Sequence, residues 1–99
     1  MKIKILKSAR EDFLAGYQFY ESQEKGLGLY FIDALFSDID SLLIYAGVHS
    51  IHFSKYYRLL SKRFPYAVYY RIQNNQILIH AVFDCRQNPD VIKKRLKKR

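Results

Sequence analysis

One segment, 77–83, constrains the fold more than any other. Six of its seven residues are apolar, and only His80 interrupts the run. A strand with one solvent-facing side alternates polar and apolar residues, so a nearly unbroken apolar run indicates a strand that is covered on both faces. The sequence therefore predicts a layered fold in which 77–83 lies inside a sheet.

Two weaker strand patterns precede this run, at 56–62 and 66–72. Asn74 and Asn75 separate the second pattern from 77–83, and asparagine tolerates the positive φ angles of a tight hairpin turn. The three segments are expected to form an antiparallel meander. Alternation over 2–6 predicts one further short strand. The stretch 48–55 has no clean period and indicates a loop or an irregular edge.

Two helices are expected between the first strand and the meander. Ser8 and Glu11 have the spacing of a capping box, which predicts a helix from about Ala9 to Glu24. Gly26 and Gly28 supply a permissive link to a second helix over about 29–46, which Gly47 ends. Apolar spacing places their buried stripes at Ala9, Phe13, Gly16 or Tyr17 and Tyr20, and at Ile32, Leu35, Phe36, Ile39, Leu42 and Leu43. The solvent-facing side of the second helix is expected at Asp33, Asp38, Asp40 and Ser41.

The predicted class is α+β. An N-terminal strand and a helical hairpin precede a three-stranded antiparallel meander, the helices lie on one face of the sheet, and 90–99 forms a short basic helix or tail. A chain of 99 residues with 49% hydrophobic residues suits a single domain, 1–99. The single cysteine, Cys85, excludes an internal disulfide framework. With no apolar run near about 18 residues and no signal-peptide pattern, a soluble cytoplasmic protein is expected.

The charge is divided unevenly along the chain. The net charge is +8, yet 1–48 carries five basic and seven acidic residues, and 49–99 carries twelve basic and two acidic ones. Six of the last seven residues are basic. This asymmetry predicts an anionic partner, which from the residues alone is a nucleic acid, an acidic protein or a membrane surface.

Several short blocks of residues follow one another in a specific order along nearly the whole chain. They are Ser8-Ala9-Arg10-Glu11-Asp12-Phe13, Tyr20-Glu21, Gly26-Leu27-Gly28-x-x-Phe31, Tyr57-Arg58-Leu59-Leu60, Arg63-Phe64-Pro65-Tyr66-x-x-x-Tyr70-Arg71, and Ile79-x-Ala81-Val82-Phe83-Asp84-Cys85-Arg86-Gln87-Asn88-Pro89. In this order and spacing they resemble the RelE/ParE superfamily of toxins from bacterial type II toxin–antitoxin systems. The resemblance implies a curved antiparallel sheet and a helical hairpin.

The resemblance also implies partners. A cognate acidic antitoxin would neutralise the toxin and link it to operator DNA, which leaves no role for a membrane. RelE-like members cleave mRNA on the ribosome, whereas ParE-like members bind DNA gyrase and hydrolyse no RNA. The Arg63-to-Tyr66 block resembles the ParE-like branch. Ala67 stands where RelE-like enzymes carry an arginine, Asp84 stands where many relatives carry a histidine or a basic residue, and no tyrosine follows Tyr70. The leading hypothesis is therefore a ParE-like toxin that inhibits growth by binding gyrase.

Two alternatives stay open. A RelE-like, metal-independent endoribonuclease would need a general base, a general acid and cations, for which the candidates are Arg58, Arg63, His80 and Arg86, with Arg71 on the same predicted face. An inactive homologue would act only within an antitoxin–operator complex. His80 also suits a core histidine, because it lies within an apolar strand.

Contact with the target or partner is assigned to the basic half. The candidates are Arg63, Tyr66, Arg71, Arg86, Lys93, Lys94, Arg95, Lys97, Lys98 and Arg99. No metal and no cofactor is expected, since His49 and His52 have no acidic or cysteine ligand near them in sequence. Asp84 and Arg86 are expected to form an ion pair.

Overall fold

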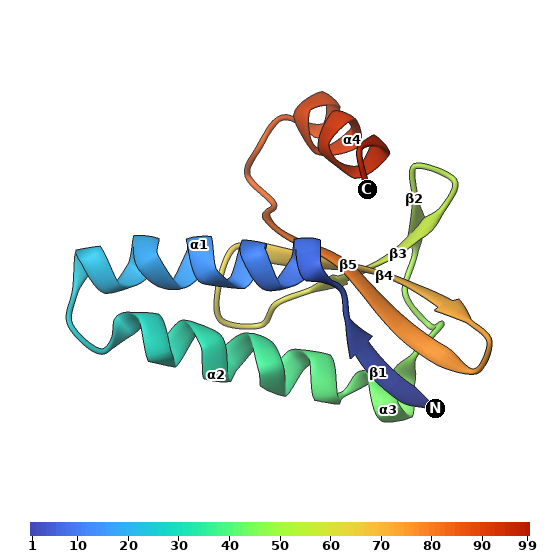
Figure 1. Ribbon diagram of the computed structural model, residues 1–99, viewed down its shortest axis with the longest axis horizontal. Coiled ribbons are helices and arrows are strands. Elements are labelled where there is room, and N and C mark those ends of the chain that lie inside the picture. Colours follow the sequence, from blue (N-terminus) through green and yellow to red (C-terminus); the bar gives the residue numbers. More distant parts are fainter.

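A five-stranded sheet forms the centre of the computed structural model, which describes all 99 residues, Met1–Arg99. The strand order is β1-β5-β4-β3-β2, and a helical hairpin lies across one face of the sheet (Figure 1). The elements are β1 (Lys2–Ile5), α1 (Lys7–Gln23), α2 (Leu27–Asp40), α3 (Leu42–Tyr45), β2 (Ile51–His52), β3 (Tyr56–Leu60), β4 (Tyr66–Gln73), β5 (Gln76–Asp84) and α4 (Pro89–Lys97). The predicted α+β class and the order of strand, hairpin and meander are confirmed.

β5 occupies the interior position that its apolar run predicted. It pairs with β1 in parallel, with Ile3 opposite Ile77, and with β4 in the antiparallel sense. Ile77 and Ile79 belong to the core on one face of the sheet, whereas Ala81 and Phe83 belong to the core on the other. Since both faces are covered, the strand has no position for the polar residues that usually alternate along it.

The tight turns lie where the sequence predicted them. Asn74 and Asn75 have φ angles of 52° and 60°, the two positive values that a type I′ hairpin requires. Gly26 (φ 89°) links α1 to α2, and Gly47 (φ 91°) follows α3. None of the helices is both long enough and apolar enough to cross a membrane.

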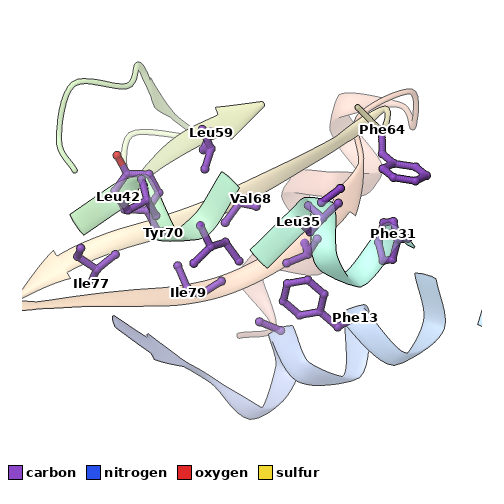
Figure 2. Packing of buried hydrophobic residues seen from close by; sticks show 14 residues of the cluster. Phe13, Phe31, Leu35, Leu42, Leu59, Phe64, Val68, Tyr70, Ile77 and Ile79 are labelled. Carbon is purple, nitrogen blue, oxygen red and sulfur yellow. The ribbon is translucent and has the colours of Figure 1, made fainter. Parts of the chain in front are cut away.

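The larger hydrophobic core lies between the hairpin and the sheet (Figure 2). Phe13 from α1 and Phe31 and Leu35 from α2 meet Val68 and Ile79 from the sheet. Each such side chain contributes about 1.5–3 kcal/mol on full burial, so this interface supplies much of the stability.

A smaller cluster lies on the opposite face of the sheet. Its members are Tyr56, Ala67, Tyr69, Ala81, Phe83, Ile92 and Leu96. The last two residues come from α4, so α4 covers the face that the hairpin leaves open. The predicted hairpin therefore occupies one face, and the short basic helix, whose position the sequence left open, occupies the other.

The predicted capping box at Ser8 and Glu11 is wrong. α1 begins at Lys7, and the residue before it, Leu6, makes no side-chain capping bond. The Leu6 N–H donates to the Ile79 carbonyl oxygen at 3.1 Å, so β1 runs directly into the helix. Ser8 instead donates its Oγ–H to the His80 carbonyl oxygen at 2.9 Å. The Ser8 hydroxyl therefore joins α1 to β5 instead of capping its own helix.

The predicted helix over 29–46 is interrupted. α2 ends at Asp40 and α3 resumes at Leu42. At the break Ser41 donates its Oγ–H to the Asp38 carbonyl oxygen at 2.5 Å, and such bonding by a serine side chain competes with the helical ladder and bends helices. The stretch 48–55, taken as a loop or irregular edge, contains the two-residue edge strand β2.

The prediction that Asp38 faces solvent is wrong. It is 7% exposed, and its Oδ2 accepts hydrogen bonds from Ser61 Oγ at 2.7 Å and from the Lys62 N–H at 3.4 Å. This carboxylate fixes the loop between β3 and β4 against α2. Asp38 lies three residues after Leu35 and four before Leu42, so it belongs to the apolar stripe that was predicted around it.

Candidate functional site

α4 divides the basic residues of the tail into two sets. Asn88 begins the helix, and its Oδ1 accepts the Asp90 N–H at 2.8 Å, while Pro89 occupies the first turn. Ile92 and Leu96 are 4% and 2% exposed and pack on the sheet. The remaining positions of the helix decide which cations face the protein and which face solvent.

Arg95 and Arg99 turn toward the protein. Their guanidinium carbons lie 4.2 Å and 4.7 Å from the centre of the Phe83 ring, a cation–π geometry. Arg99 donates from Nη1 to Asp12 Oδ2 at 2.6 Å, from Nη2 to Asp12 Oδ1 at 2.8 Å, and from Nη1 to the His80 carbonyl oxygen at 3.1 Å. Arg95 Nη2 lies 3.9 Å from Asp12 Oδ1. These two arginines fasten α4 to α1 and β5.

Asp12 is the residue holding α4 in place that the sequence interpretation missed. Its side chain is 6% exposed, and besides Arg99 its Oδ2 accepts the Val82 N–H at 2.9 Å. Asp12 lies three residues after Ala9 and four before Gly16, on the stripe that was predicted to be buried. A carboxylate at such a position needs a cationic partner, which is the signal that could have identified it.

The other cations of the tail face solvent. Lys93, Lys94, Lys97 and Lys98 are exposed, and none of them forms an ion pair. Because α4 carries them on one side of the molecule, they form a cationic ridge, a name we keep for these four lysines. Because these lysines have no acidic partners, the ridge produces a positive electrostatic potential on the side of the molecule where α4 lies.

His80 lies under this helix, at a bulge in β5. Tyr69 pairs with Ala81 whereas Tyr70 pairs with Ile79, so His80 is the extra residue. It is 9% exposed, and neither ring nitrogen has a hydrogen-bond partner. The sequence allowed a core histidine at this position, and the observed burial fits that interpretation.

The surroundings of His80 favour its neutral form. Burial lowers the pKa of His80, and the positive charges of Arg71, Lys55 and Arg99 lower it further. The Tyr56 ring meets the imidazole edge-on, with centroids 5.2 Å apart. A neutral imidazole keeps one ring N–H and can accept a proton, but it does not serve as a general acid near neutral pH.

Arg58, Arg71 and His80 share one face of the sheet. The expectation that Arg63 and Arg86 converge with them is wrong. Arg58 lies on β3 beside Tyr69, on the α4 face, and its Nε is buried without a partner. Arg63 lies in the loop after β3, with its guanidinium carbon 5.9 Å from the Tyr30 ring centre. Arg86 lies in the loop after β5. Arg58 and His80 therefore share a face that Arg63 and Arg86 do not reach.

Arg86 and Asp84 form the expected ion pair. The guanidinium donates to both carboxylate oxygens, at 3.0 Å and 2.7 Å. These bonds lower the pKa of Asp84 and raise that of Arg86. The Arg86 side chain is 64% exposed, so the pair brackets a turn and leaves the guanidinium accessible.

The two other contact candidates lie apart from each other. Tyr66 is half-buried and packs against Tyr20 and Phe31, and burial raises its pKa to about 12. Arg71 lies near the far end of β4, on the face of Tyr69. Tyr66 thus belongs to the hairpin side, whereas Arg71 belongs to the α4 side.

His49 and His52 each have a partner of their own. Tyr70 OH bonds to His49 Nδ1 at 2.5 Å, and the Ser50 hydroxyl bonds to His52 Nε2 at 3.0 Å. No three His, Cys, Asp or Glu side chains gather closely enough to hold a metal ion.

A comparison with solved structures finds this architecture in a chain of the "Chromosomal ParDE TA system from P. aeruginosa". The TM-score is 0.78, and the match covers 85% of this chain and 95% of that one. This chain shares the fold of that ParDE chain. The identity is 18%, so the likeness extends to the fold, and the fold that the resemblance implied is confirmed. No protein-family model and no curated protein matches the sequence. Within this shared fold, α4 and its C-cap residue Lys98 carry the cationic ridge.

Proposed function

We propose that this protein is the toxin of a type II toxin–antitoxin system and inhibits growth by binding its target, with DNA gyrase as that target. A cognate acidic antitoxin neutralises it in the cytoplasm and carries it to operator DNA. The observation that carries the proposal is the structural likeness to a chain of a ParDE TA system. The four unpaired lysines of α4 support an anionic or nucleic-acid-associated partner.

The arrangement of the side chains favours binding over catalysis. General acid–base catalysis needs groups within hydrogen-bond reach of the reacting atoms. His80 is 9% exposed, lies under α4 and favours the neutral state, while Arg63 and Arg86 lie in loops away from it. The four candidates Arg58, Arg63, His80 and Arg86 therefore do not form one assembled set of acid, base and cations.

Two assays test this function in sequence. Expression without the neighbouring reading frames is expected to arrest growth, and co-expression of an adjacent small acidic protein is expected to restore it. Purified protein is then expected to inhibit DNA supercoiling by gyrase and to accumulate cleaved DNA. Growth arrest without any effect on gyrase at excess protein would refute the gyrase target. Normal growth would instead favour the inactive homologue.

A second candidate function is a ribosome-dependent mRNA endoribonuclease. Arg58 Nε and both ring nitrogens of His80 are buried without partners on the same face of the sheet, and such orphaned groups often occur at functional sites. Primer extension on mRNA from arrested cells decides between the two functions. In-frame cleavage that disappears in His80→Leu would favour the nuclease, and intact mRNA would eliminate it.

A further inference from the structure

A small cavity opens between α4 and the turn that joins β2 to β3. It measures about 190 Å³, and its lining residues are Phe53, Lys55, Tyr56, Lys93, Leu96 and Lys97. In Figure 1 this turn and the end of α4 lie on the same side of the molecule. The cavity is smaller than the roughly 300–1,000 Å³ of ordinary small-molecule sites, so it suits a single side chain.

The lining combines an apolar floor with a cationic rim. Tyr56 and Leu96 are 3% and 2% exposed and form the floor. Lys93 and Lys97 are one helical turn apart on α4 and stand on one side, and Lys55 stands on the other. None of the three lysines has an acidic partner. An occupant must therefore combine an apolar group with negative charge around it.

The backbone at Phe53 shows that its ring is held at this cavity against a conformational cost. Phe53 and Ser54 have φ angles of 57° and 60°, the pair of values that Asn-Gly usually supplies in a tight hairpin turn. A bulky residue rarely adopts this conformation. The Phe53 side chain forms one wall of the cavity in spite of this strained backbone. Strained backbone of this kind clusters at ligand-binding sites and in switch regions.

We infer that this cavity binds an acidic polypeptide segment by taking up one apolar side chain while Lys55, Lys93 and Lys97 pair with carboxylates beside it. A nucleobase fits less well, because base stacking needs an open aromatic face. The Tyr56 ring is buried, and the Phe53 ring packs against His52 and Tyr69, with centroids 6.3 Å away in both cases. The inference rests on the proposed function in one respect, that the segment belongs to the neutralising partner.

The test uses the full chain, isotope-labelled for NMR. Its ligand is a heptapeptide with leucine at its centre and glutamate at each of the six remaining positions. Peptide-induced shifts are expected at the cavity, and exchange of leucine for serine in the peptide should weaken binding about tenfold. Phe53→Asn keeps a residue that tolerates positive φ and removes the apolar wall, so a similar loss is expected. An octathymidylate strand serves as the competing nucleic-acid probe.

A matched pair of charge reversals makes the test specific. Lys93→Glu with Lys97→Glu removes two cations from the rim, whereas Lys94→Glu with Lys98→Glu makes the same change in net charge on the same helix, outside the cavity. The first pair should weaken peptide binding at least about tenfold more than the second. Equal losses, or no shifts at the cavity, would overturn the inference, as would octathymidylate binding that is tighter and depends on Lys93 and Lys97.

This outcome is separable from the growth assay. Peptide binding without growth arrest would leave the cavity assigned and the toxin function refuted. Growth arrest without peptide binding would support the toxin function and refute the assignment of the cavity.

Discussion

Arg99 and Asp12 form a two-armed ion pair that joins the end of the C-terminal helix to the first helix, with N–O distances of 2.6 Å and 2.8 Å. The Asp12 and Arg99 side chains are 6% and 16% exposed, so water screens the pair weakly. Removing one partner leaves the other charge poorly solvated. Asp12→Asn, which retains an oxygen for the Val82 N–H, is expected to cost about 2–4 kcal/mol of unfolding free energy.

Arg99→Gln tests how far the ion pair with Asp12 holds α4 against the sheet. Amide hydrogen exchange within 89–97 should speed up, while protection in β4 and β5 stays high, because the larger core does not involve Arg99. Lys98→Gln is the matched control and should leave exchange unchanged, since Lys98 forms no ion pair. Unchanged exchange in Arg99→Gln would mean that the buried side chains of α4 suffice to dock it.

The cationic ridge is expected to act in binding and not in folding. Replacing Lys93, Lys94, Lys97 and Lys98 by glutamine should change the free energy of unfolding by no more than about 0.5 kcal/mol each. Binding to the target should weaken, and its dependence on salt concentration should become shallower. Titrations at several salt concentrations, with urea unfolding alongside, measure both effects. A parallel loss of stability would contradict the separation.

Deleting 93–99 would not test the ridge by itself. The deletion removes Leu96 and Arg99 together with the lysines, and therefore exposes the face of the sheet that α4 covers. Loss of binding after such a deletion would not distinguish charge from unfolding.

Gly28 is required by the packing of the two hairpin helices. A Cβ at this position would lie 2.8 Å from the Tyr17 carbonyl oxygen. Backbone atoms cannot rotate away, so Gly28→Ala should cost about 1–3 kcal/mol in urea unfolding. Gly26→Asn is the control, since nothing lies within 4 Å of its Cβ position and asparagine tolerates its positive φ. Equal stability of the two variants would refute the close contact.

His80 makes stability depend on pH. Burial lowers its pKa, as it does for His49 and His52. The unfolded chain therefore binds more protons than the folded one once the pH falls through about 6.5, so stability is full above about pH 7 and declines below it. His80→Leu removes a buried group that has no partner, and it should keep or raise stability at neutral pH and flatten the decline.

Urea unfolding between about pH 5 and pH 8 measures this dependence. His52→Leu serves as the control at a more exposed histidine. A decline in His80→Leu as steep as that of the unchanged chain would assign the pH dependence to other groups.

Apolar spacing predicted the elements of this fold better than it predicted their polar contacts. The run 77–83 identified the interior strand, and Asn74 and Asn75 identified the hairpin turn, because both signals are local. Ser8 matched a local capping pattern, but its hydroxyl bonds to His80, which is distant in sequence. No local pattern contains that partner.

The same limit applies to the candidate site. Asp12 and Arg99 are far apart in the sequence, so no spacing rule relates them. The sequence therefore assigns all six basic residues of the tail to contact with a partner. The structure turns Arg95 and Arg99 inward and leaves the four lysines outside. Phe53 lies in a stretch without a clean period, so its positive φ angle and its place at the cavity become visible only in the structure.

The parallel pairing of β1 with β5 has a consequence for synthesis. A ribosome makes residues 2–5 more than seventy residues before β5, so β1 has no partner in the sheet until residues 76–84 have emerged. Until then the hairpin carries an apolar side with no sheet to cover it. The sheet therefore closes only after β5 has emerged, and a partner already present in the cell would meet this protein during the interval in which its core is still open.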